Sequence, residues 1–132
     1  NLKAEMEDLA PSFDQAYAAL ISDLDERGML DSTLVVMATE FGRKPDYNGN
    51  GRGHYPICFS SVLAGGGIKR GFVYGGSDER GAQPDKPVTF GDFHATIGRA
   101  AGLSLEKPAH TSSGRPFQVG GSRAKPITEL FA

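Results

Sequence analysis

The sequence predicts an α/β fold, and three features of the chain point to this class. A helical pattern covers Pro11 to Arg27, an apolar run rich in β-branched residues follows from Thr33 to Ala38, and a second apolar run covers Ile57 to Ala64. A helix, a short loop and an apolar strand in this order form one α/β unit. We therefore expect part of a sheet with helices on both faces, within a single domain that spans residues 1–132.

The first helix is predicted from the spacing of its apolar residues. Pro11 suits the first turn of a helix, where its missing N–H costs nothing. Apolar side chains then recur on one face, at Phe13, Ala16, Tyr17, Leu20, Ile21 and Leu24. Gly28 is a natural residue to follow the helix end. Residues 2–9 are expected to form a short separate helix, joined through the break at Pro11.

The later elements are predicted from apolar runs and from glycine and proline. The uninterrupted apolar run from Thr33 to Ala38 is typical of a strand that is covered on both faces. Ile57–Ala64 is the second expected strand, which Gly65 to Gly67 would end. Residues 71–74 suit a short strand or hairpin arm. A second helix is expected over residues 92–101, capped by Thr89 or Gly91, and a last helical turn over residues 127–131.

Composition excludes two classes of partner. The formal net charge is −2, without the basic surplus that nucleic-acid binding usually requires, so we expect no nucleic-acid partner. No apolar run approaches the ~20 residues of a membrane span. The single cysteine, Cys58, rules out an internal disulfide and leaves the redox compartment undecided. Because the chain starts at Asn1 within polar helical sequence, we expect it to be a fragment of a longer protein.

The strongest functional signal is the segment from Thr33 to His54. An acid, Glu40, and a base, Arg43, follow the first apolar strand, and Arg52 and His54 lie beyond a glycine-rich stretch. Ligands of open α/β sheets bind beyond the carboxyl ends of the strands. The segment therefore predicts an anion or metal site, in which Glu40 and His54 share a pocket.

Glu40 and His54 are the predicted metal ligands. A carboxylate at a strand end can hold a cation or act as a general base, and imidazole is a common metal ligand. Two ligands fall short of the three or four that a zinc site needs, and nothing in the spacing selects Asp46 or Asp92 as additions. The alternative is an ion pair of Glu40 with Arg43 or Lys44 and a hydrogen-bonded surface His54.

Arg43 and Arg52 are the predicted anion-binding residues. A guanidinium binds phosphate or sulfate through two parallel hydrogen bonds, and the intervening glycines let backbone N–H groups approach an anion. The alternative is that both side chains are solvated. Neither GxxxxGK[ST] nor GxGxxG is present, so a nucleotide-binding loop has no support. Ser60 and Ser61 lack an adjacent base, and the proximity of Ser112 and Ser113 to His110 is only a weak signal, so no nucleophile is assigned.

The remaining histidines and the cysteine carry weaker signals. Cys58 lies within an apolar run and is expected to be a packed thiol. His94 falls in the second helix and is expected to pack, whereas His110 lies in a loop rich in serine and threonine and fits either interpretation.

Seven short stretches form an ordered set of motifs: Ala38–Arg43, Gly53–Pro56, Leu63–Gly71, Pro87–Thr89, Asp92–Ile97, Ser113–Pro116 and Pro126–Leu130. This set resembles a bacterial family, "domain of unknown function 1501", which is sulfatase-like and belongs to the alkaline-phosphatase superfamily. They keep their order over nearly the whole chain. The resemblance implies a covered α/β sheet beside two divalent metal ions (zinc, calcium or manganese) and a small phosphate or sulfate ester as substrate.

The resemblance also assigns individual positions. Glu40 matches a position that is usually a ligand Asp, Phe41 replaces the ligand His that usually follows, and His54 resembles the downstream ligand His. The family's nucleophile would lie in an N-terminal half absent from this chain, which would then be the C-terminal part of an exported, periplasmic protein. The alternative is a non-catalytic module on the same fold that binds an anion or carbohydrate.

Overall fold

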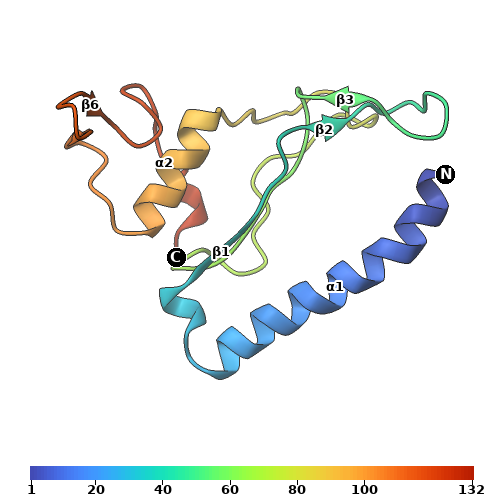
Figure 1. Ribbon diagram of the computed structural model, residues 1–132, viewed down its shortest axis with the longest axis horizontal. Coiled ribbons are helices and arrows are strands. Elements are labelled where there is room, and N and C mark those ends of the chain that lie inside the picture. Colours follow the sequence, from blue (N-terminus) through green and yellow to red (C-terminus); the bar gives the residue numbers. More distant parts are fainter.

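The computed structural model describes residues 1–132 and confirms a mixed α/β fold. Two α-helices, two short 3-10 helices and three two-stranded antiparallel sheets follow one another along the chain (Figure 1). Their bounds are α1 (Leu2–Glu26), η1 (Leu30–Ser32), β1 (Leu34–Met37), β2 (Gly42–Arg43), β3 (His54–Tyr55), β4 (Val62–Gly65), α2 (Phe90–Ala100), β5 (Ala109–His110), β6 (Pro116–Phe117) and η2 (Thr128–Leu130).

Helix α1 is one continuous helix, so the prediction of a break at Pro11 is wrong. Asn1 caps it by accepting a hydrogen bond from the backbone N–H of Lys3, and Pro11 lies in its interior. Strong helix formers surround the proline, and the backbone carbonyl it leaves unpaired lies on an exposed part of the helix, where water can satisfy it. Gly28 follows the helix with φ +66°, which confirms its predicted role.

Strands β1 and β4 form an antiparallel ribbon that is shorter and less covered than expected. Leu34 pairs with Gly65 and Met37 with Val62, so the second strand begins at Val62 instead of Ile57. No residue of either strand is fully buried, and Val36 is 38% exposed. The prediction of a strand covered on both faces is wrong for this chain, because no second layer of helices packs against the ribbon.

The end of β4 turns tightly against β1. Gly65, Gly66 and Gly67 all have positive φ, which only glycine adopts without strain. A Cβ on Gly65 would overlap the backbone carbonyl oxygens of Thr33 and Leu30. Leu30 is one of the few buried side chains. The glycine at residue 65 therefore allows the close approach that joins the two strands to the end of η1.

Helix α2 carries the best-packed part of the chain. Thr89 caps it, as predicted, by accepting a hydrogen bond from the backbone N–H of Asp92. Ala95, Thr96 and Gly98 are buried on the face that meets the C-terminal segment. The hydroxyl of Thr96 donates to the carbonyl of Asp92 and accepts from the backbone N–H of Ile127, at 2.7 and 2.9 Å. The predicted last helical turn is present as η2.

Asp92 ties the start of α2 to the C-terminal segment. Its carboxylate accepts hydrogen bonds from the backbone N–H of Lys125 (2.6 Å) and from the hydroxyl of Thr89 (2.7 Å). These hydrogen bonds, that of Lys125 first and that of Thr89 second, lower the pKa of Asp92 below its usual value of 3.8. The ionised carboxylate is therefore the form that holds the two segments together.

This shift predicts an acid-dependent contribution to stability. Because the folded pKa is the lower one, the contribution of Asp92 is complete above the unfolded pKa and is lost as pH falls through the folded pKa. We expect the stability difference between the native chain and Asp92→Asn to be constant near neutral pH and to shrink below about pH 4. Urea unfolding at several pH values measures it, and a difference that persists in strong acid would contradict the assignment.

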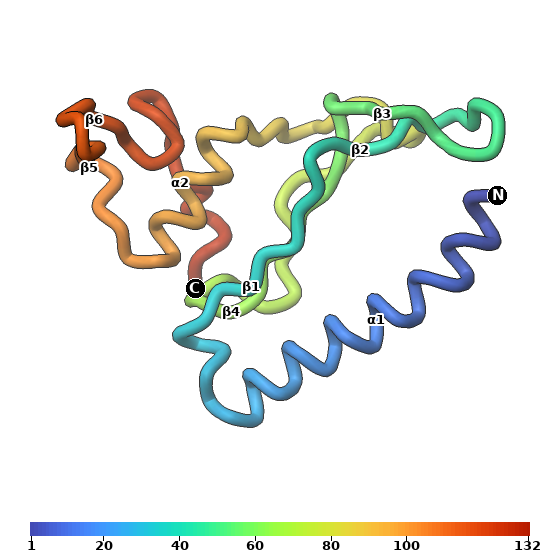
Figure 2. Tube along the Cα trace, viewed as in Figure 1, coloured from blue at the N-terminus to red at the C-terminus, as the bar shows by residue number.

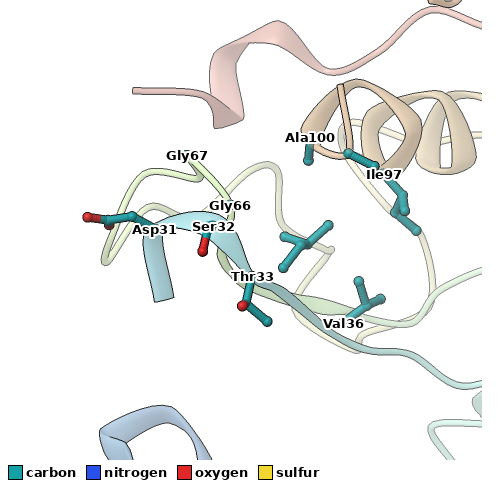
Figure 3. A pocket seen from close by; sticks show the side chains of 10 residues that line it. Asp31, Ser32, Thr33, Val36, Gly66, Gly67, Ile97 and Ala100 are labelled. Atoms are coloured by element: carbon teal, nitrogen blue, oxygen red, sulfur yellow. The ribbon is translucent and has the colours of Figure 1, made fainter. Parts of the chain in front are cut away.

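A cleft separates β1 from α2 (Figure 3). Its volume is about 590 Å³, and Val36 and Ile97 lie on its opposite walls. Asp31, Ser32 and Thr33 form its polar side, and Leu34 and Ala100 add apolar surface. The β1–β4 ribbon and α2 thus face each other without forming a continuous core.

Candidate functional site

The four residues that the sequence singled out lie along or next to the ribbon of β2 and β3. Gly42 pairs with Tyr55 and Arg43 with His54. The pairing continues to Lys44, whose backbone N–H donates to the carbonyl of Gly53 at 2.9 Å. Antiparallel pairing thus places Arg43 directly opposite His54, although eleven positions separate them in the sequence.

Phe41 contacts the side chains of both Arg43 and His54. Its ring centroid lies 3.9 Å from that of His54, with an angle of 32° between the rings. The guanidinium carbon of Arg43 lies 5.5 Å from the centre of the same phenyl ring, within the range of a cation–π contact. Phe41 therefore holds the imidazole and the guanidinium beside one another, in a role that the sequence did not reveal.

Glu40, Arg43, Arg52 and His54 form no ion pairs within the chain. Glu40 forms no ion pair with Arg43 or Lys44, so that alternative is not what the structure shows. The same holds for Arg52, which lies on the exposed loop before β3. An arginine without a carboxylate partner remains free to bind a ligand. The ribbon thus presents Arg43, Arg52 and His54 to solvent, and that cationic face is the candidate site.

The loop of residues 75–86 forms hydrogen bonds that hold the β2–β3 ribbon. The hydroxyl of Tyr55 donates to the carbonyl of Ala82 at 3.0 Å, and the guanidinium of Arg80 contacts both carboxylate oxygens of Asp46 at 3.1 and 3.0 Å. Asp78 closes the loop from within: the backbone N–H of Ala82, first among several hydrogen bonds, lowers the pKa of its carboxyl group. The loop is therefore both internally braced and joined to the ribbon.

Gly42 allows the other side of the ribbon to pack closely. A Cβ there would overlap the backbone carbonyl oxygen of Cys58 and would come within 2.8 Å of the Cβ of Phe59. The thiol-bearing residue Cys58 is itself half-buried. This contact could not be predicted from the sequence, because it depends on how Cys58 and Phe59 lie against the ribbon.

The donor set does not fit a complete metal centre. The structure contains no group of three or more His, Cys, Asp or Glu side chains that could hold a metal ion. Asp46 is paired with Arg80, and the carboxylate of Asp92 accepts hydrogen bonds from Lys125 and Thr89, so neither supplements Glu40 and His54. Phe41 lies against the imidazole of His54, and its ring offers no donor atom. The assignment of Glu40 and His54 as metal ligands stays a prediction. A complete metal site would require further ligands from another polypeptide segment.

The two remaining histidines are exposed. The Nδ1 atom of His94 lies 2.7 Å from the carbonyl oxygen of Phe90, and its ring meets Phe93 edge to face at 6.2 Å. The expected packing of His94 is thus limited to its own helix. His110 lies in β5, opposite Pro116, away from the ribbon.

The comparison with protein families agrees with the motifs. The model of the family described as "Protein of unknown function (DUF1501)" matches residues 1–131. The chain belongs to this family. No curated protein and no solved structure matches the chain. Neither of its helices has the length and the apolar character required to cross a membrane.

The family model matches a range that includes every stretch on which the resemblance rests. The stretch Ala38–Arg43 leads into β2 and Gly53–Pro56 contains β3, so two of these stretches form one ribbon. A third, Leu63–Gly71, contains β4 and the glycine turn. The pairing of Arg43 with His54 therefore joins two of the stretches on which the resemblance rests.

Proposed function

We propose that this chain recognises a small phosphate- or sulfate-type anion on the ribbon of β2 and β3, as the C-terminal portion of a sulfatase-like ester hydrolase. The observation that carries the proposal is the juxtaposition of Arg43 and His54 on the ring of Phe41, without any carboxylate partner. A guanidinium offers two parallel donors to a tetrahedral oxyanion, and a ring N–H of the imidazole adds a third.

Arg52 and the loop backbone extend this cationic face. Arg52 and Gly53 immediately precede His54, so they share its strand end. Gly49 has positive φ and helps the loop to reverse between β2 and β3. Because these residues are exposed, an anion would be bound in competition with water and salt. We therefore expect weak binding by the chain alone, which the remainder of the active site would strengthen.

The hydrolytic part of the proposal needs groups that this chain does not contain. The superfamily resemblance supports a metal-dependent hydrolase with its nucleophile in an N-terminal half, which would then be a partner of this chain, and an exported, periplasmic location. Glu40 and His54 would be this chain's share of the ligands. Since two donors do not form a closed centre, we assign no catalytic step to them.

A second candidate function is a non-catalytic module that binds an anion or a carbohydrate. Phe41 favours it, because the ring occupies the position where the resemblance leads one to expect a ligand histidine. Metal analysis of the native protein separates the two functions. Stoichiometric zinc, calcium or manganese, together with turnover of a phosphate or sulfate ester, supports the hydrolase, and anion binding without metal supports the module.

The anion site itself is tested with inorganic phosphate and sulfate. We expect either ion to shift the amide resonances of Arg43, Arg52 and His54 in a nuclear magnetic resonance titration at low ionic strength. Replacing Arg43 by Ala should raise the dissociation constant about tenfold, the effect of losing one charge-assisted contact of roughly 1.4 kcal/mol. Binding should also weaken as salt is added.

Arg115→Ala is the matched control. Arg115 is also an exposed arginine without an ion pair, but it precedes β6, away from the ribbon. Its removal costs the same formal charge and should leave the dissociation constant within about twofold. Equal effects of the two substitutions would show that only net charge matters, and that result would remove the proposed site.

A further inference from the structure

Helix α1 is long and barely packed. It spans Leu2–Glu26, and none of its residues is buried. Its hydrogen bonds and ion pairs with the remainder of the chain lie near its two ends: the backbone N–H of Leu2 donates to the carbonyl of Asn50, and Asp25 pairs with Arg70 at 2.9 Å. In its middle, the hydroxyl of Tyr17 is buried without a hydrogen-bond partner. Figures 1 and 2 show its middle running apart from β1 and β2. Such a helix owes little of its stability to contacts within this chain.

An apolar stripe follows the exposed side of α1. Met6, Leu9, Phe13 and Leu20 are 54%, 65%, 54% and 47% exposed. Together with Ala16 they alternate at spacings of three and four residues, the pattern of a helix seam that packs against a partner. Phe13 stacks on Tyr17, with ring centroids 5.8 Å apart, which prolongs the apolar surface around the helix.

The chain exposes enough surface area for a partner to bury a large interface on it. The chain exposes 9634 Å². A compact monomer of 14.0 kDa would expose about 6,700 Å². The excess is about 2,900 Å², several times the ~800 Å² that each partner buries in a standard stable interface. The exposed stripe of α1 belongs to this excess.

Charge indicates what kind of surface would cover the stripe. Helix α1 contains seven acidic side chains and one lysine, a formal charge of −6, whereas the remainder of the chain has thirteen basic and nine acidic side chains, a charge of +4. On the helical wheel, Glu5 and Asp23 flank one side of the stripe and Asp14 lies beyond the other. Glu5 and Asp23 form only exposed ion pairs, with the N-terminus and with Arg27, and Asp14 forms none. A partner with basic side chains beside its own apolar stripe complements this arrangement.

We propose that the stripe of α1 is a docking surface for a basic amphipathic helix of another polypeptide segment, one with an apolar seam bordered by lysine or arginine. A second copy of α1 is a poor occupant, because two helices of charge −6 would then lie side by side. The inference is independent of the anion site, since α1 contributes no residue to the β2–β3 ribbon.

Two synthetic peptides of about 25 residues provide the test, each with leucine at the seam positions. One has lysine at the flanking positions and the other has glutamate. Fluorescence anisotropy with the 132-residue chain should show at least about tenfold tighter binding of the lysine peptide, and added salt should reduce that preference. Equal affinities, or a preference for the glutamate peptide, would overturn the proposal.

Matched substitutions place the binding on the helix. Phe13→Asp should weaken binding of the lysine peptide about tenfold, because a charge would interrupt the apolar seam. Ser22→Asp adds the same charge nine residues later, on the opposite side of α1, and should change binding by less than about twofold. Leu9→Gln, an uncharged variant, should weaken binding in the same direction, and circular dichroism verifies that each variant keeps its helix.

Sedimentation of the chain alone completes the test. A monomer with an accessible stripe is the expected result. A stable dimer that Phe13→Asp dissociates would show that a second copy covers α1, and it would overturn the proposed partner. Binding of the lysine peptide that neither Phe13→Asp nor Leu9→Gln weakens would overturn the proposed surface.

Discussion

Gly65→Ala is expected to abolish the β1–β4 ribbon. The new Cβ would overlap the carbonyl oxygens of Thr33 and Leu30, and it would also come within 2.8 Å of a side-chain methyl of Leu30. A backbone at φ +79° adds strain of about 1–2 kcal/mol for any residue with a Cβ. Because the obstacles are mainly backbone atoms, they cannot move aside without breaking the pairing. We expect a total loss of more than about 3 kcal/mol.

Gly67→Ala separates the two causes of this loss. Gly67 has nearly the same φ, +78°, but a Cβ there would meet no atom within 4 Å. The variant should therefore show the backbone strain alone, about 1–2 kcal/mol. Urea unfolding of both variants measures the difference. If the two substitutions destabilised the chain equally, the close approach of Gly65 to Leu30 and Thr33 would not be a feature of the folded protein.

Thr96→Val is expected to release the C-terminal segment from α2. Thr96 is fully buried, at 0% exposure, and its hydroxyl is the acceptor for the backbone N–H of Ile127. Valine fills the same space but offers no acceptor, so this N–H would lose its partner. A buried donor without a partner costs about 1–3 kcal/mol. Hydrogen exchange at the amide of Ile127 should accelerate more than exchange within the middle of α2.

Thr96→Ser is the control for this substitution. Serine keeps the hydroxyl and removes only a methyl group, so the amide of Ile127 should stay protected. The loss in stability should be close to the transfer energy of one buried methyl group, about 1 kcal/mol. Equal acceleration of exchange in the serine and valine variants would contradict the role of the hydrogen bond.

The sequence predicted the elements whose signals are local. Thr89 is a cap because its side chain reaches a backbone N–H three residues later, and Gly28 ends α1 because its φ is positive. The predicted helix break at Pro11 is wrong, because the strong helix formers on both sides outweigh one missing hydrogen bond. The burial of Leu34–Met37 could not be inferred, because it depends on surfaces that would have to pack against the strand and are absent from this chain.

The residues of the candidate site were selected from the sequence, but their arrangement could not be. Arginine, histidine and glutamate near a strand end suggest anion or metal chemistry, yet their distances depend on the register of a ribbon only two residues long on each side. That register places Arg43 opposite His54 and brings Phe41 against the imidazole. A phenylalanine in a proposed metal motif suggests a missing ligand, whereas in the structure its ring lies between the imidazole of His54 and the guanidinium of Arg43.

The backbone of Cys58 lies against Gly42, immediately behind the ribbon, and Cys58 is the chain's single thiol. A maleimide dye would consequently label each molecule at one defined place. Because the thiol is half-buried, the labelling rate would depend on how often the β2–β3 ribbon separates from the backbone of Cys58 by local unfolding. Slower labelling in phosphate or sulfate would make this cysteine an intrinsic reporter of ligand-induced ordering.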